Sequence, residues 1–253
     1  LVTPVASATL RWVTRRVLCA CALTTSDSAY MAERMRALGA REVMVFPFGL
    51  EALPPPARDK DDALFFANRG LEPIYAPQRV IEAFAAVAAD WPAARLVVAN
   101  DGSLAPELRR QAAALGLQGR VQFVGRLDAA TQAGWYDRAR WYWSLPCSDS
   151  VAVSVLEAMA HGCVPILSDL PANRELVEPG RNGLVLGDGE RPGAAALQAL
   201  LPAAARIAED NRAWIAAHAI FPEAVERFLQ REIGQGDVVA RQRGIVEVEH
   251  LQA

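Results

Sequence analysis

The sequence is almost without lysine. Of its 26 basic residues only Lys60 is a lysine, and all the others are arginines. A phosphate-binding site in this chain would therefore use guanidinium groups or backbone amides. Acidic residues slightly outnumber basic ones, for a formal net charge of −3. A chain with this charge balance has no excess positive charge to attract a nucleic-acid backbone, so no nucleic-acid partner is expected.

Cysteine, histidine and long apolar runs are also scarce. The four cysteines, Cys19, Cys21, Cys147 and Cys163, fit neither a zinc site nor a disulfide framework, and they indicate small buried side chains in a reducing cytoplasm. No aspartate pair or histidine cluster is present, so we expect no metal and no other cofactor. No uncharged apolar stretch approaches 18 residues, so we expect no transmembrane helix and no signal peptide. The chain begins at Leu1, and we expect it to be truncated.

Short apolar runs alternate with longer amphipathic ones. This alternation predicts an α/β fold in which a parallel sheet carries helices on both faces. The predicted strands are residues 20–24, 43–46, 64–67, 96–99, 121–124, 141–145, 164–167 and 183–186. The predicted helices between them are residues 28–38, 78–90, 104–115, 129–140 and 151–161. After residue 193 the pattern is helical only, with helices expected at 195–208, 210–218 and 222–231.

A proline-rich, charged segment at residues 50–62 indicates a domain boundary, because Pro54, Pro55 and Pro56 follow one another there. The residues before it form too few elements for an independent core. We therefore predict three parts. Residues 1–48 are the end of a Rossmann-like domain whose beginning is missing, residues 49–234 form the main Rossmann-like domain with its closing helices, and residues 235–253 are a tail.

The most informative stretch follows the strand predicted at 141–145. Ser148, Asp149 and Ser150 are all typical N-cap residues, and they precede a helix expected to open near Val151. The free amides and partial positive charge of a helix N-terminus suit a phosphate group. Glu157 follows Asp149 by just over two turns, so its carboxylate can face the same cleft and bind a pair of sugar hydroxyls. From spacing alone, a capped amphipathic helix with a glutamate on its buried face explains the pattern equally well.

The same stretch resembles the donor-site signature of the sucrose-synthase and mannosyltransferase-like retaining glycosyltransferases (glycosyltransferases group 1). The resemblance is carried by Asp149 and Glu157, by Ala-Met-Ala at 158–160, by Gly162, and by a strand that contains Pro165. Residues 168–185 also match, and similar segments extend the resemblance over residues 20–231.

The resemblance implies a GT-B fold, in which two Rossmann-like domains face each other across a cleft. It implies transfer of a sugar from a nucleotide diphosphate sugar to a glycan or lipid-linked acceptor, with retention of the anomeric configuration. A bacterial enzyme of polysaccharide biosynthesis is expected, located in the cytoplasm or peripherally at the inner face of the membrane. Two alternatives stay open: a non-catalytic fragment that binds nucleotide sugar, and a nucleotide-sugar epimerase, which shares the two-domain plan.

The resemblance also assigns roles to individual residues. Arg69, just beyond the first strand of the donor domain, would bind the diphosphate and act in catalysis. Asp149 would hold a hydroxyl of the donor sugar, and Glu157 would hold the ribose. Further donor contacts are expected from Ser150, Val151, Ser154 and Arg126.

One position departs from the family pattern. The lysine that usually follows the diphosphate arginine five residues later is Ile74 here. The second cation is therefore missing or comes from elsewhere, and Arg79 and Arg126 are the candidates.

Several other groups have two interpretations. The aromatic cluster at 135–143 is expected in the core rather than as a platform for a base, and His161 is expected in a turn or in the core. Glu175 could line the sugar pocket or belong to the opening of a helix. The arginines of the first segment could form a solvated helix face or contact a membrane surface; these are Arg11, Arg15 and Arg16.

Overall fold

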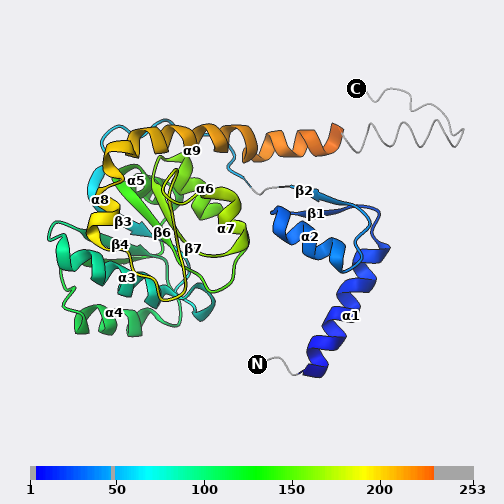
Figure 1. Ribbon diagram of the computed structural model, residues 1–253, viewed down its shortest axis with the longest axis horizontal. Coiled ribbons are helices and arrows are strands. Elements are labelled where there is room, and N and C mark those ends of the chain that lie inside the picture. Colours follow the sequence, from blue (N-terminus) through cyan, green and yellow to red (C-terminus); the bar gives the residue numbers. More distant parts are fainter. Residues whose placement is uncertain (1–3, 47–48, 231–253) are drawn as a thin grey trace, which may run out of the picture.

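The computed structural model describes residues 4–46 and 49–230 (Figure 1). Its main sheet has six parallel strands in the order β5-β4-β3-β6-β7-β8. Starting from β3, the chain builds the sheet outward on one side, and it then returns to build the other side from β6. The strands are β3 (Asp61–Ala67), β4 (Arg95–Ala99), β5 (Val121–Gly125), β6 (Ala139–Ser144), β7 (Val164–Ser168) and β8 (Leu184–Leu186).

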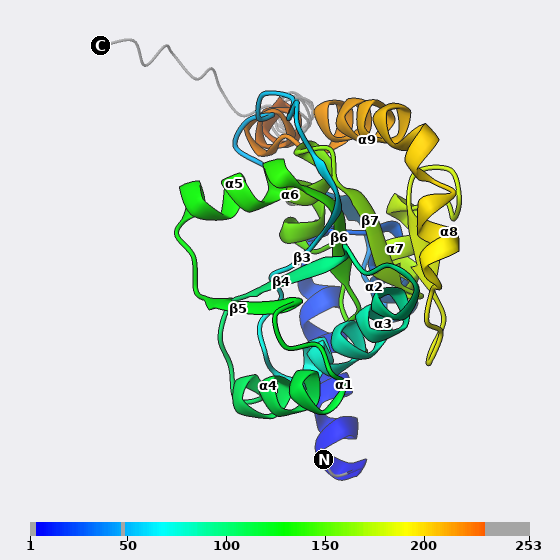
Figure 2. The ribbon, with the colours of Figure 1, turned by 90° about the vertical axis from the view of Figure 1, so that its left-hand side faces the viewer.

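Helices cover both faces of this sheet, as the alternating pattern predicts. Figure 2 shows α3 (Pro77–Asp90) and α4 (Ala105–Ala114) on one side, and α5 (Ala129–Arg138) and α6 (Val153–Ala160) on the other. Successive strand residues serve opposite cores: Phe65 packs with α3, whereas Phe66 packs with α5 and α6. Because both faces are buried, the strands consist of continuous apolar runs.

The strand order reverses between β3 and β6, which are direct neighbours. In open parallel sheets, ligands bind beyond the carboxyl ends of the strands at such a switch point. Asn68 and Arg69 follow β3, and residues 145–152 follow β6. The topology therefore brings the predicted diphosphate arginine beside the predicted donor-site loop.

A smaller N-terminal unit precedes the main sheet. It contains α1 (Pro4–Ala20), then the parallel strands β1 (Thr24–Ser26) and β2 (Val43–Val45), joined by α2 (Ala29–Ala37). The first strand was expected at 20–24, but it lies at Thr24–Ser26, and Ala20 is the last residue of α1. Leu18, near the end of α1, is buried and packs with Ala32 and Val43. Arg11, Arg15 and Arg16 lie on α1, in agreement with the expected helix face, and only the span of this helix was not predicted.

The remaining elements close the main sheet. They are the 3-10 turn η1 (Pro73–Tyr75), α7 (Pro171–Leu176), α8 (Ala194–Gln198), the 3-10 turn η2 (Leu201–Ala203), and α9 (Ala204–His218). The predicted break near residue 209 is wrong. α9 runs through this position, and Asn211, two residues further on, is fully buried and exchanges hydrogen bonds with Asn182.

Residues 221–230 form a further helix that extends toward the N-terminal unit (Figure 1). There Phe46 makes edge contacts with Phe221 and Phe228, and Leu50 pairs with Ile220. Within the described residues, no helix has the length and apolar character needed to cross a membrane. The predicted boundary at 48/49 adjoins residues 47–48, which lie outside the described part, as does the predicted tail at 235–253. The division into domains stays a prediction.

Candidate functional site

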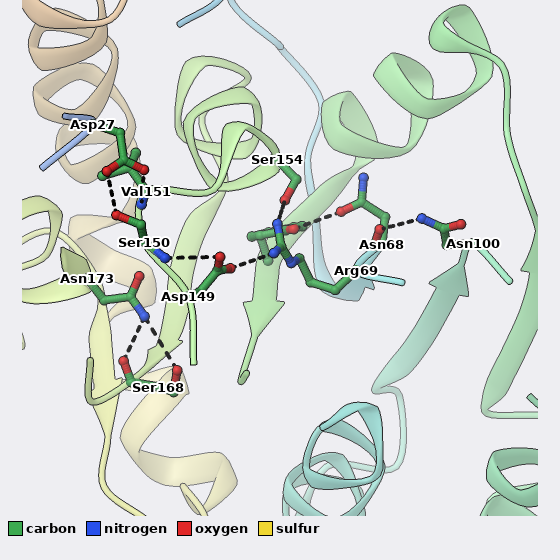
Figure 3. A network of polar contacts seen from close by, with 11 residues as sticks. Asp27, Asn68, Arg69, Asn100, Asp149, Ser150, Val151, Ser154, Ser168 and Asn173 are labelled. Atoms are coloured by element: carbon green, nitrogen blue, oxygen red, sulfur yellow. Dashed lines mark hydrogen bonds and ion pairs between the residues drawn. The ribbon is translucent and has the colours of Figure 1, made fainter. Parts of the chain in front are cut away.

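Arg69 is the central cation of the site. Its Nη2 donates a hydrogen bond to Oδ2 of Asp149 at 2.5 Å, and its Nη1 donates to Oγ of Ser154 at 3.2 Å (Figure 3). The guanidinium carbon lies 4.5 Å from the ring centre of Tyr75, a cation–π distance. The arginine side chain is 18% exposed and that of Asp149 is 21% exposed. The structure thus brings three of the predicted site residues into direct contact.

The helix that carries the signature begins later than predicted. α6 starts at Val153 instead of Val151, and its N-cap is Ala152, which has no side chain able to cap it. None of the described residues accepts a hydrogen bond from the amides of Val153 and Ser154. These two amides therefore provide the open donors at the helix N-terminus.

Ser150, one of the residues expected to cap α6, is bound to the N-terminal unit together with its neighbour Val151. Ser150 donates from its hydroxyl to Oδ1 of Asp27 at 2.6 Å, and the amide of Val151 reaches Oδ2 of Asp27 at 3.3 Å. The amide of Ser150 donates to Oδ1 of Asp149 at 3.0 Å. The predicted donor contacts from Ser150 and Val151 are thus already occupied in this arrangement, because the β6–α6 loop (residues 145–152) is bonded to Asp27 at these two positions.

Glu175 has a role that neither sequence interpretation included. It lies within α7, and its carboxylate accepts hydrogen bonds from the amides of Ala29 and Tyr30 at 2.8 and 2.7 Å. These amides open α2, so Glu175 satisfies the N-terminus of a helix that belongs to the other unit. The two units are therefore joined by two carboxylates: Asp27 of the N-terminal unit bonds to the loop before α6, and Glu175 on α7 bonds to the start of α2.

Glu157 lies on α6 and points toward α5. Its Oε2 accepts a hydrogen bond from the Tyr136 hydroxyl at 2.9 Å and from Nε2 of Gln132 at 3.3 Å. Glu157 also lines a cavity of about 720 Å³ together with the segment after residue 48, including Leu50, and with Pro222. The carboxylate is thus held on one side and open on the other.

Electrostatics in the site are set by burial. Desolvation raises the pKa of Asp149, the nearby Arg69 guanidinium opposes that rise, and the carboxylate of Asp27 adds to it. Desolvation also raises the pKa of Tyr136, and the negative charge of Glu157 contributes to that rise. Tyr136 therefore stays a protonated hydrogen-bond donor across the physiological range.

No described contact joins either candidate for the second cation to Arg69 or Asp149. Arg79 lies 3.4 Å from Asp188 and from the carbonyl of Gly187, beyond β8. Arg126 is exposed, and no described residue bonds to it. Ile74 is 56% exposed in η1. Lys60 precedes β3, and its Nζ donates to the carbonyls of Tyr136 and Ala139 at 2.7 and 2.9 Å, which places it away from Arg69, at the opposite end of the strand.

The aromatic cluster lies in the core, as expected. Trp141, Tyr142 and Trp143 are fully buried on β6. His161 is buried beside them, where its ring stacks on Tyr136 and its Nδ1 lies 2.7 Å from Asp137. Over residues 4–46 and 49–230, no three histidine, cysteine or acidic side chains gather in a way that could hold a metal ion.

Four contributors to the network were missed from the sequence: Asp27, Asn68, Gln132 and Tyr136. Asn68 precedes Arg69 at the end of β3, and this position at a strand's carboxyl end is the signal that could have identified it. Gln132 and Tyr136 lie on α5 and Asp27 lies between β1 and α2, and these residues reach the site only through folding.

Comparison with known proteins agrees with this geometry. The family model described as Glycosyl transferases group 1 matches residues 61–203. A stretch of 125 residues is 32% identical to the alpha-monoglucosyldiacylglycerol synthase of Streptococcus pneumoniae, covering 49% of this chain and 28% of that protein. A stretch of 120 residues is 29% identical to the GDP-mannose:cellobiosyl-diphosphopolyprenol alpha-mannosyltransferase of Komagataeibacter xylinus, covering 47% of this chain and 30% of that protein. These matches thus span less than a third of each curated relative.

The fold is also that of a solved structure. The Anabaena protein HepE, crystallised with UDP, superposes with a TM-score of 0.75 over 90% of this chain and 68% of its own, at 18% identity. The parallel sheet and its helices therefore match the GT-B architecture that the resemblance implied. The family match covers more than half of the chain and includes both Arg69 and the acidic pair. The chain belongs to the group 1 glycosyltransferases.

Proposed function

We propose that the protein transfers a sugar from a nucleotide diphosphate sugar to a hydroxyl of a glycan or lipid-linked acceptor, with retention of the anomeric configuration. The observation that carries this proposal is the convergence of Arg69, Asp149 and the open amides of Val153 and Ser154 at the switch point of the sheet. A guanidinium beside a helix N-terminus matches the charge of a diphosphate.

The proposed reaction depends mainly on stabilising the leaving group. The bond from the anomeric carbon to the β-phosphate oxygen breaks, and its electron pair stays on the diphosphate. The acceptor hydroxyl oxygen bonds to the same face of that carbon, and its proton passes to the departing diphosphate oxygen. Arg69 and the α6 amides would offset the charge that develops on the diphosphate. Asp149 would hold a hydroxyl of the sugar, and we propose that no metal is required.

The relatives support the choice of donor and acceptor classes. One relative is named for GDP-mannose and a diphosphopolyprenol, another is named for a diacylglycerol, and HepE was crystallised with UDP. For this chain, uridine and guanosine nucleotides are therefore the donors to test first. We likewise propose that the acceptor is lipid-linked and that the protein works at the inner face of a membrane.

Product analysis tests the proposal. The protein is incubated with UDP-sugars or GDP-mannose and a lipid-linked acceptor, and the anomeric configuration of the product is read by NMR. We expect a product with the configuration of the donor. An inverted product would contradict retention, and isomerisation of the donor sugar without transfer would identify an epimerase.

The non-catalytic alternative has an observation in its favour. Ile74 stands where the family usually has a lysine, and Arg69 already pairs with Asp149 at 2.5 Å, so less cationic charge is available to the leaving group. Calorimetry with UDP and GDP separates the two cases. Binding of a nucleotide without transfer to any acceptor or hydrolysis of the donor would favour a binding module.

A further inference from the structure

The carboxylate of Glu157 is held by two donors from the same helix. Gln132 and Tyr136 are four residues apart on α5 and therefore share one face of it. Both donate to the same oxygen, Oε2, at 3.3 and 2.9 Å. Oε1 accepts no hydrogen bond from any described residue, and Glu157 borders the cavity described above. One oxygen is thus occupied by the protein while the other is available to a ligand.

Tyr136 is itself fixed on several sides. Its hydroxyl accepts a hydrogen bond from Nδ2 of Asn68 at 2.7 Å and also lies 3.2 Å from the carbonyl of Ser154. Its ring packs edge-on against Phe66 and stacks on His161. The side chain is 1% exposed. A donor held this rigidly limits the rotation of the carboxylate that it contacts.

Asn68 links this support to the diphosphate arginine. Its Oδ1 accepts from the hydroxyl of Tyr142 at 2.7 Å, which orients the amide so that Nδ2 faces Tyr136. Arg69 is the next residue along the chain. The end of β3 therefore contributes to both parts of the site: Asn68 supports Glu157 through Tyr136, and Arg69 supplies the cation. Because the two residues are consecutive, the strand fixes the position of the ribose contact relative to the diphosphate contact.

We infer that Tyr136, assisted by Gln132, is a positioning residue that orients the carboxylate of Glu157 toward the two hydroxyls of a nucleotide ribose. The inference rests on the proposed nucleotide-binding function. A carboxylate gains most from a vicinal diol when its free lone pairs already point at the hydroxyls, because no rotation has to be restricted on binding. Removing the tyrosine hydroxyl should therefore reduce selectivity for the diol more than affinity for the rest of the nucleotide.

The test compares the affinities of UDP and GDP with those of their 2′,3′-dideoxy analogues, measured by calorimetry on the full chain. The unsubstituted protein should prefer the ribose form of the base that it binds by about tenfold or more. Tyr136→Phe should lower this preference by about threefold to tenfold by weakening the ribose form alone. Tyr30→Phe is the control: it removes a tyrosine hydroxyl that contacts Arg34 on α2 and no residue of this network, so the preference should persist.

An unchanged preference in Tyr136→Phe, or an equal loss in Tyr30→Phe, would overturn the positioning role while leaving the proposed function intact. If the unsubstituted protein binds neither nucleotide, the proposed function fails and the inference fails with it. If it binds one without preferring the ribose form, only the role of Glu157 and its support is overturned. If Tyr136→Phe does not fold, Gln132→Met is measured in its place. Gln132 is half-buried on α5, and an unchanged preference for the ribose form in this variant would also overturn the inference.

Discussion

Asp27 accepts a hydrogen bond from the hydroxyl of Ser150 at 2.6 Å, and this contact joins the N-terminal unit to the loop that precedes α6. The contact continues inward, because the amide of Ser150 donates to Asp149 and Asp149 pairs with Arg69 (Figure 3). A residue of the smaller unit thus stands at the end of a chain of contacts that reaches the proposed diphosphate cation.

The substitution Asp27→Ala should loosen the β6–α6 loop. Two hydrogen bonds to a carboxylate are lost at a half-buried position, which corresponds to about 1 kcal/mol of local stability. Hydrogen exchange at residues 148–152 should accelerate by roughly threefold to tenfold. Glu175→Gln is the control, since it weakens contacts with the amides of Ala29 and Tyr30 in α2 and leaves this loop untouched. Equal loop exchange in the unsubstituted protein and Asp27→Ala would contradict the coupling.

The substitution Arg69→Ala should separate diphosphate binding from nucleoside binding. A guanidinium–phosphate hydrogen bond in a partly closed site contributes about 1.5–3 kcal/mol, so affinity for UDP or GDP should fall by about tenfold to a hundredfold. Affinity for the free nucleoside should stay nearly constant. Arg69→Lys should lose part of the affinity because its ammonium cannot form the two-pronged contact.

Arg140→Ala provides the control for Arg69, because Arg140 lies near the start of β6, at the opposite end of the strands from Arg69, and pairs with Asp62. We expect its nucleotide affinity to match that of the unsubstituted protein. Equal losses of diphosphate and nucleoside affinity in Arg69→Ala would assign the arginine to folding or to the base instead.

The substitution Glu157→Ala should weaken nucleotide binding by about 1.5–3 kcal/mol, because the ribose loses a charged acceptor. Calorimetry with the nucleotide that the protein binds gives the measurement. If affinity does not change, Glu157 is not part of the site, and Tyr136 then serves only the core.

Chelation with EDTA should leave donor binding and transfer unchanged. The proposed charge compensation comes from Arg69 and from the N-terminus of α6, and neither needs a divalent ion. Titration of magnesium or manganese into the chelated protein is the measurement, with nucleotide affinity and transfer rate as readouts. A strict requirement for either ion would refute the account.

Lys60 should leave a signature in the pH dependence of stability. Burial lowers the pKa of Lys60 below its ordinary value of 10.5. Between the folded pKa and 10.5 the unfolded chain binds more protons than the folded one, so this residue makes stability rise with pH in that window. Denaturant unfolding of the unsubstituted protein and Lys60→Met, measured between pH 8 and 11, should show the unsubstituted protein gaining relative stability as pH rises. Parallel curves would contradict the lowered pKa.

Most of the main sheet was predictable because its signals are local. Strands buried on both faces require continuous apolar runs, and all eight predicted strands overlap observed ones, although the first does so only at Thr24. The errors occur where tertiary contacts overrule local type. A break was predicted near residue 209, but α9 continues there and Asn211 is fully buried against Asn182. A strand was predicted from residue 20, but α1 extends to Ala20, with Leu18 packed on Ala32 and Val43.

The candidate site was predictable only in part. Arg69, Asp149 and Glu157 lie within short motifs, so a resemblance could identify them. The residues that orient these three side chains belong to no motif. In the sequence Tyr136 has the pattern of an ordinary core aromatic residue, and Asp27 is 123 residues away from Ser150. Such contacts arise from the packing of separate elements, which no local pattern specifies.

The sequence by itself determined the alternation of strands and helices, the family, and the residue types available for a diphosphate, because these depend on local pattern and composition. Only the tertiary structure decided which hydrogen-bond donors of the site remain free for a ligand. In the folded chain α6 begins at Val153, Ser150 and Val151 donate to Asp27, and Glu157 accepts from Tyr136. The physical reason is that each hydrogen-bonding group takes the partner that folding brings within about 3 Å. Those partners lie on other elements, so their identity depends on the path of the whole chain.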